Sequence, residues 1–155
     1  MTLYALRPDP VTGSLDDAEV ISESSYGWQF LEQAVTLWRL LDNARADEIE
    51  AIMDRASIAA GDGELCFHAP ALHELVRLLS GVEDAIIAGG IVDQHWRVPS
   101  ERLEELAKLV PAMDLKTERS LKSKTNALGE VMSNAISIRN FLSNSVKAGC
   151  VVVLG

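Results

Sequence analysis

The feature that most constrains the fold is a series of apolar residues near the C-terminal end of the sequence, repeated every three or four positions. This spacing places side chains on one face of an α-helix. Asp114 can cap the start of such a helix, and Gly149 is typical of its stop. We therefore predict one long helix over residues 115–147. Its core-facing stripe comprises Leu121, Leu128, Met132, Ala135, Leu142 and Val146.

Shorter segments with helical spacing fill most of the remaining sequence, separated by glycine, proline and polar links. The first is expected to begin at Ser14, with two aspartates in its first turn, and to break at residues 24–27. The others are expected over residues 28–41, 47–60, 70–79, 82–92 and about 103–110. These segments predict an all-α fold, a bundle of five to seven helices that forms a single domain over residues 1–155.

The two ends of the sequence are short apolar segments that do not fit helices. Residues 3–6 stop abruptly at Arg7 and Pro8, and residues 150–154 are rich in valine, a β-branched residue that favours strands. We expect the two ends to pair as a small two-stranded ribbon. Such a ribbon needs a helical layer beneath it to be stable.

Composition limits the classes of protein to which the chain can belong. With 155 residues, 48% of them hydrophobic, the chain can bury a core without a metal or a disulfide. We expect the two cysteines to be reduced, and we expect neither a metal nor a cofactor. The net charge of −9 argues against binding to nucleic acid or to an anionic membrane. No apolar run approaches the ~20 residues of a spanning helix, and the N-terminus does not resemble a signal peptide, so we expect a cytoplasmic protein.

Charge is divided unevenly along the chain. Residues 1–114 carry a net charge of −13, whereas residues 115–155 carry +4. The simplest interpretation is a basic helix that lies across an acidic bundle. Arg139 interrupts the apolar stripe of that helix, and we expect it to reach solvent or to pair with a carboxylate of the acidic part.

Only one cluster in the sequence has catalytic or metal-binding character, namely Cys66, His68 and His73. A zinc site needs further ligands at a recognisable spacing, and the sequence offers no second pair. A nucleophile and its base also rarely meet when they are two residues apart. An enzyme or small-ligand binder, with a site between helices near these residues, is therefore an alternative hypothesis. We do not expect enzymatic activity.

Three surface features are candidates for binding a partner. The segment His95, Trp96 and Arg97 lies in an expected loop and contains residue types that dominate binding energy at interfaces. The alternative interpretation is that Trp96 folds back and fills a gap between helices. An acidic strip on one helix face is either a solvated surface or a dock for a basic protein. A stripe of small polar residues on the long helix is either ordinary surface or a flat contact. The acidic strip comprises Asp47, Glu50 and Asp54, and the polar stripe includes Ser133, Ser137, Asn140 and Asn144.

These observations favour a non-enzymatic module that docks on a protein with a basic surface, of the immunity, antitoxin or inhibitor type. The expectation rests on a small, acidic sequence without catalytic motifs. A structural homo-oligomer that pairs the polar stripes of two long helices is a further alternative.

Overall fold

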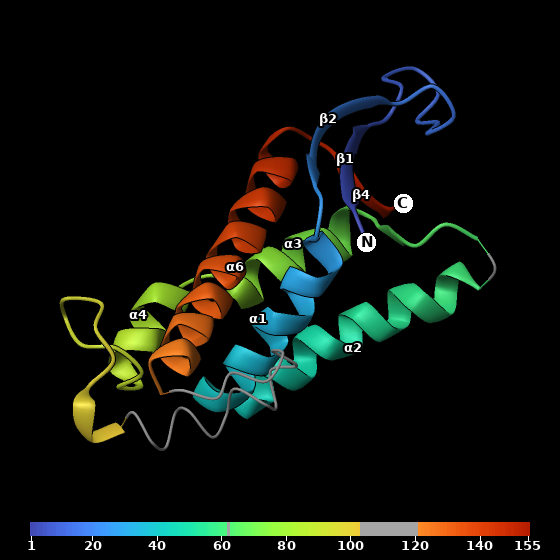
Figure 1. Cartoon of the computed structure of the whole chain (residues 1–155). Coiled ribbons are helices and arrows are strands. Elements are labelled where there is room, and N and C mark those ends of the chain that lie inside the picture. Colours follow the sequence, from blue (N-terminus) through green and yellow to red (C-terminus); the bar gives the residue numbers. More distant parts are fainter. Residues whose placement is uncertain (62, 103–120) are drawn as a thin grey trace.

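The protein has a mixed α/β fold, so the prediction of an all-α bundle is wrong. The computed structural model describes residues 1–61, 63–102 and 121–155, and the side chains of residues 121–127 are not described. Helices pack beside a four-stranded antiparallel sheet, which lies near both chain ends (Figure 1). The helix expected over residues 103–110 and the cap expected at Asp114 lie outside the described residues.

The sheet is built around the two chain ends, as their apolar sequences predict. The ends pair antiparallel, with Leu3 opposite Leu154 and Leu6 opposite Val151, which confirms their pairing, but they form the centre of a four-stranded sheet and not a two-stranded ribbon. Two further strands extend this ribbon on either side, giving the order β2-β1-β4-β3. The strands are β1 (Leu3–Arg7), β2 (Glu19–Ser24), β3 (Cys66–Phe67) and β4 (Val151–Leu154).

The helix expected from Ser14 is replaced by a turn and a strand. The carboxylate of Asp9 accepts hydrogen bonds from the backbone N–H groups of Val11 and Thr12, which fixes a turn. The hydroxyl of Ser14 accepts from the backbone of Asp16, but no helix follows this local bond. The chain instead returns as β2, which pairs with β1. Pairing with β1 gives residues 19–24 hydrogen-bond partners along one side of the strand, whereas a short isolated helix is marginal in water.

Most helix boundaries agree with the predicted stop signals. The helix that follows Asp42 begins four residues before the predicted start, because the Asp42 carboxylate accepts from the backbone N–H of Arg45 and caps it. The described residues form the helices α1 (Gly27–Leu41), α2 (Asn43–Ala60), α3 (Ala69–Leu79), α4 (Val82–Ala88) and α6 (Leu121–Lys147), and a 3₁₀ turn spans Ser100–Arg102. None of the helices within the described residues is long and apolar enough to cross a membrane.

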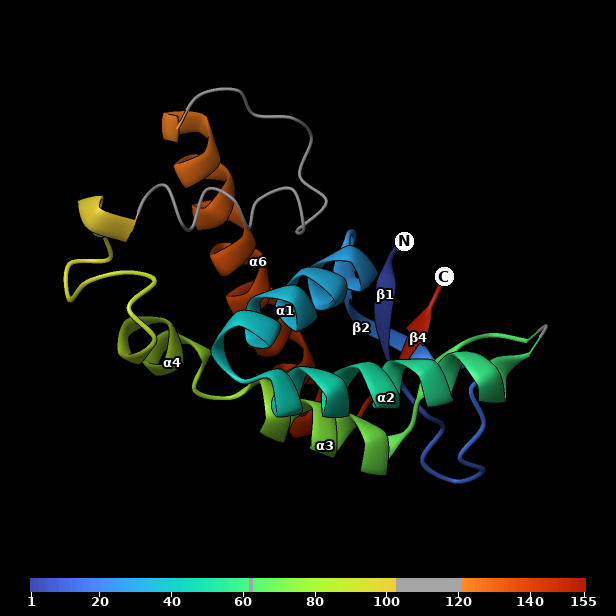
Figure 2. The same ribbon diagram turned by 90° about the horizontal axis from the view of Figure 1, so that it is seen from below.

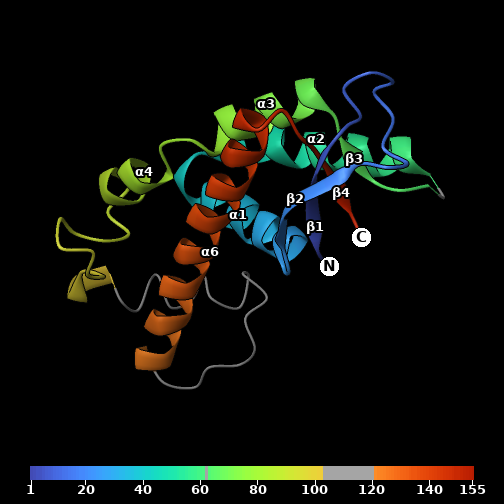
Figure 3. The same cartoon turned by 90° about the horizontal axis from the view of Figure 1, so that it is seen from above.

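The core lies where α1 packs against both α6 and α2, as the views in Figures 2 and 3 show. The predicted stripe of α6 faces this core, and Val131 and Ile138 extend it. Val146 is only partly buried, and the side chain of Leu121 lies outside the described part. The buried members of the predicted stripe are Leu128, Met132, Ala135 and Leu142.

Arg139 joins the basic helix to the acidic part of the chain. Its Nη1 forms a short ion pair with Glu83 Oε2, at the start of α4. The Arg139 side chain is only 19% exposed, so this bond is shielded more than an ordinary surface pair. The hydrogen bond from Arg139 lowers the pKa of Glu83 and so favours the ionised carboxylate. This contact confirms the predicted pairing of Arg139 with a carboxylate.

Candidate protein-binding groove

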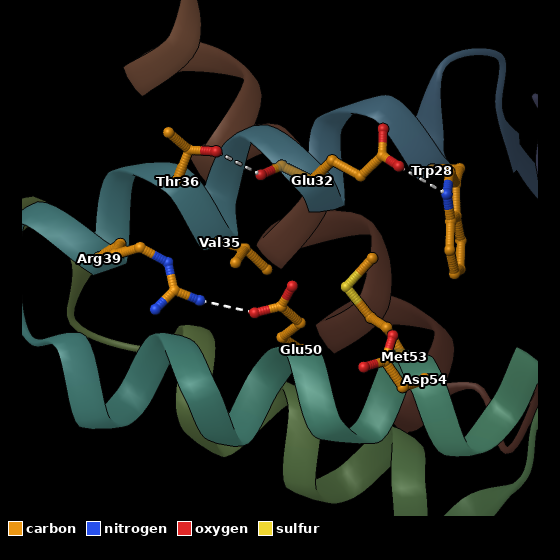
Figure 4. Close-up of a pocket in the computed structure, with 8 residues that line it drawn as sticks. All are labelled: Trp28, Glu32, Val35, Thr36, Arg39, Glu50, Met53 and Asp54. Carbon is orange, nitrogen blue, oxygen red and sulfur yellow. Dashed lines mark hydrogen bonds and ion pairs between the residues drawn. The ribbon is translucent and has the colours of Figure 1, made fainter. Parts of the chain in front are cut away.

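A groove of about 430 Å³ lies between the facing sides of α1 and α2 (Figure 4). Residues of α1 at intervals of three or four form one wall, because this spacing keeps side chains on one face of a helix. The second helix supplies the opposite wall. The lining residues are Trp28, Glu32, Val35, Thr36 and Arg39 of α1, with Glu50, Met53 and Asp54 of α2.

The floor of the groove is apolar and one of its ends is aromatic. Val35 and Met53 are only 8% and 6% exposed, so they belong to the core as much as to the groove. Trp28 is half-buried and stacks on the fully buried Phe67, with ring centroids 6.3 Å apart and ring planes inclined by 17°. Because Phe67 belongs to the sheet, this stacking holds the indole of Trp28 in a fixed position.

Charged side chains surround this floor. Glu32 Oε1 accepts a hydrogen bond of 3.0 Å from Trp28 Nε1, and the Glu32 backbone carbonyl accepts from the Thr36 hydroxyl. At the other end, Arg39 spans the two helices, with Nη1 at 2.8 Å from Asp47 Oδ1 and Nη2 at 2.6 Å from Glu50 Oε2. The hydrogen bond to Asp47 is the main reason that the pKa of Arg39 is raised.

The predicted acidic strip is therefore divided into two parts. Asp47, Glu50 and Asp54 are all exposed on α2, as their spacing predicts. Asp47 and Glu50 share an ion pair with Arg39, whereas Asp54 faces the groove and forms no ion pair within the described part of the chain. Neither Arg39 nor Trp28 is among the candidate binding residues that the sequence predicts. Glu32, four residues after Trp28, was the available signal that this helix face is partly polar.

The loop of His95, Trp96 and Arg97 is a second exposed surface. The Asp93 carboxylate accepts hydrogen bonds from the backbone N–H groups of Arg97 and His95, which lower the pKa of Asp93 and fix the turn. Trp96 has a positive φ of 60° and is 46% exposed, so it does not plug a gap between helices. In Figure 1 the loop lies beyond α4, away from the groove.

The polar stripe of α6 is exposed along its described length. Ser133, Ser137, Asn140 and Asn144 all face solvent, and Asn140 Oδ1 accepts from the guanidinium of Arg139. This placement agrees both with an ordinary solvated face and with a flat contact surface. The stripe does not line the groove.

The cluster of Cys66, His68 and His73 does not form a built catalytic site. Cys66 Sγ lies 3.9 Å from His68 Nδ1, and both histidines are exposed. Burial, with a smaller contribution from Glu64, raises the pKa of the Cys66 thiol and so disfavours the reactive thiolate. Within the described residues, no group of three or more His, Cys, Asp or Glu side chains is placed to hold a metal ion.

Comparison of the chain with models of known protein families, with curated proteins and with solved structures finds no match. The groove and the exposed loop must therefore be interpreted from their own geometry and chemistry.

Proposed function

We propose that this chain is a non-enzymatic module that docks on another protein with a basic surface, as immunity, antitoxin and inhibitor-type proteins do. One observation carries the proposal: the groove between α1 and α2 combines the half-buried indole of Trp28 and an apolar floor with carboxylates at its rim. Apolar surface supplies most of the energy of an interface, and complementary charge selects the partner.

The charge of the molecule supports a basic partner. A net charge of −9 attracts positively charged proteins over several ångströms and speeds their encounter at low ionic strength. An isolated surface carboxylate adds little binding energy, because water competes with it. Beside the apolar floor of Val35 and Met53, however, a docked partner would exclude water and strengthen the attraction to the rim.

The loop of His95, Trp96 and Arg97 is proposed as a second contact. Its exposed indole is presented by a turn that Asp93 fixes, so that little conformational entropy is lost when a partner covers it. Because the loop and the groove lie on separate parts of the molecule, their contributions to binding can be measured separately.

The proposal can be tested with two charge reversals of the same size. The tagged chain, its Asp54→Lys variant and its Asp84→Lys variant would be used to capture proteins from cells of the organism that makes the chain. Asp84 is an exposed aspartate on α4 and does not line the groove. Any captured protein would then be identified, purified and titrated against all three forms by calorimetry, at low and at physiological salt.

We expect a basic protein to bind the unmodified chain and the Asp84→Lys variant with similar affinity. Asp54→Lys should weaken its binding by more than about tenfold, which corresponds to ~1.4 kcal/mol. Binding should also fall as salt increases. Failure of purified candidates to bind, or an equal loss of affinity in both variants, would contradict docking at the groove.

A further inference from the structure

The two ends of the groove differ in a way that suggests what fills it. At one end the groove already contains a guanidinium. Arg39 bonds Asp47 and Glu50, and its Nη1 also donates to Asn43 Oδ1 at 2.8 Å. This arrangement holds a guanidinium between carboxylates at the junction of α1 and α2, and both of its terminal nitrogens donate hydrogen bonds.

The opposite end has similar acidic groups, and no cation among the described residues lines it. Glu32 and Asp54 line it, and neither forms an ion pair within the described ranges of the chain. One oxygen of Glu32 accepts from Trp28 Nε1, and its other oxygen remains able to accept a further hydrogen bond. Figure 4 shows Trp28 closing this end, with Glu32 on one wall and Met53 and Asp54 on the other.

We propose that the Trp28 end of the groove receives the guanidinium of an arginine side chain from the basic partner. This inference rests on the docking function proposed above and names the group that the groove recognises. A guanidinium is planar, is attracted to an aromatic face and presents several N–H donors to carboxylates. Its apolar stem can lie over Met53 while its donors reach Glu32 and Asp54.

Arginine fits this end better than lysine for a physical reason. The ammonium of lysine is a compact, strongly hydrated charge, so it loses more hydration when it enters a partly apolar groove. It also lacks the planar fork that can bond carboxylates from two helices. The stacking of Trp28 on Phe67 and its bond to Glu32 hold the aromatic end in place before binding, which reduces the entropy lost.

The test uses two small probes and the full chain. The N-acetylated, C-amidated tripeptides Gly-Arg-Gly and Gly-Lys-Gly would each be titrated into isotope-labelled protein at low salt. The indole N–H signals of Trp28, Trp38 and Trp96 would be followed by NMR. A Trp28→Phe variant identifies the signal of Trp28. Asp54→Asn tests the site, and Asp84→Asn is its matched control with the same change of charge.

We expect the arginine peptide to shift the Trp28 signal in a saturable manner, with the Trp96 signal unchanged. The lysine peptide should bind at least about threefold more weakly. Asp54→Asn should weaken arginine binding at least about threefold, whereas Asp84→Asn should leave it unchanged.

The assignment is overturned by a Trp28 signal that does not respond, by equal binding of the two peptides, or by equal effects of the two aspartate variants. These outcomes are separate from those of the docking experiment. If Asp54→Lys abolishes partner binding but the arginine peptide never moves the Trp28 signal, docking at the groove stands and arginine is not its occupant.

Discussion

Replacing Gly27 with alanine tests how closely α1 approaches the sheet. Gly27 is the first residue of α1, and a Cβ placed there would lie 2.8 Å from Leu3 Cγ and Cδ1. Leu3 is fully buried and β1 is paired on both sides, so this side chain cannot move away easily. Overpacking of this kind costs about 1–3 kcal/mol, whereas alanine gains up to about 1 kcal/mol over glycine in a helix. We therefore expect a net loss of up to about 3 kcal/mol in the free energy of unfolding.

The measurement is urea unfolding followed by circular dichroism, with Gly129→Ala as the matched control. Gly129 lies within α6, and no described atom outside its own helix turn comes within 4 Å of the Cβ that alanine would add. This control should therefore gain about 0.5–1 kcal/mol. Adding Leu3→Ala to Gly27→Ala should cost less than the sum of the two single changes, because the clashing atoms are then gone. A stabilising Gly27→Ala, or strict additivity with Leu3→Ala, would refute the close contact.

Three further outcomes follow from the packing and charges described above. Leu128→Ala should lower the free energy of unfolding by about 2–5 kcal/mol in a urea titration, because Leu128 is 1% exposed. The control Ser133→Ala, on the exposed side of α6, should change it by no more than about 0.5 kcal/mol. Arg139 lowers the pKa of Glu83, so this pair stabilises the fold above the ordinary glutamate pKa of 4.5 and is lost as the pH falls through the lower folded value. Glu83→Gln should therefore make stability less dependent on pH in that acidic range. Trp96→Gly should leave the melting temperature unchanged or slightly higher, because glycine adopts a positive φ without strain and the indole is largely exposed.

Local signals in the sequence were sufficient for the long helices and for the pairing of the chain ends. The stripe of α6 has a period that only a helix can bury on one side, and the valines of β4 favour a strand. The helix ends at Gly61, Ser80 and Gly149 could also be predicted from the sequence, because glycine and capping residues end helices for local steric reasons. In each case the physical cause lies within a few residues of the feature.

The remaining strands were missed because their causes are not local. The sequence of β2 is mostly polar, and its strand conformation depends on hydrogen bonds to β1, more than ten residues earlier. The two residues of β3 become a strand only because β4 arrives from the far end of the chain. Aspartates near Ser14 resemble a helix start, and the tertiary pairing outweighs that weak preference.

Only part of the groove could be predicted from the sequence, for the same reason. Glu50 and Asp54 share a helix face, so their spacing alone predicted an acidic strip. Arg39 reaches Asp47 and Glu50 across the break at Asp42. Because the arginine and the two acids belong to different helices, helical spacing does not predict that they meet.

This internal pairing also explains why charge alone does not identify the docking site. Arg39 forms ion pairs with two acids of the predicted strip, and Arg77 forms ion pairs with Glu48 and Glu74. Part of the negative charge of these carboxylates is therefore already compensated by the chain's own arginines. What distinguishes the Trp28 end of the groove is Asp54, a carboxylate with no ion pair among the described residues, beside the half-buried indole of Trp28 that a partner can cover. Because water is displaced there, the same charge has a larger effect on binding than it has elsewhere on the surface.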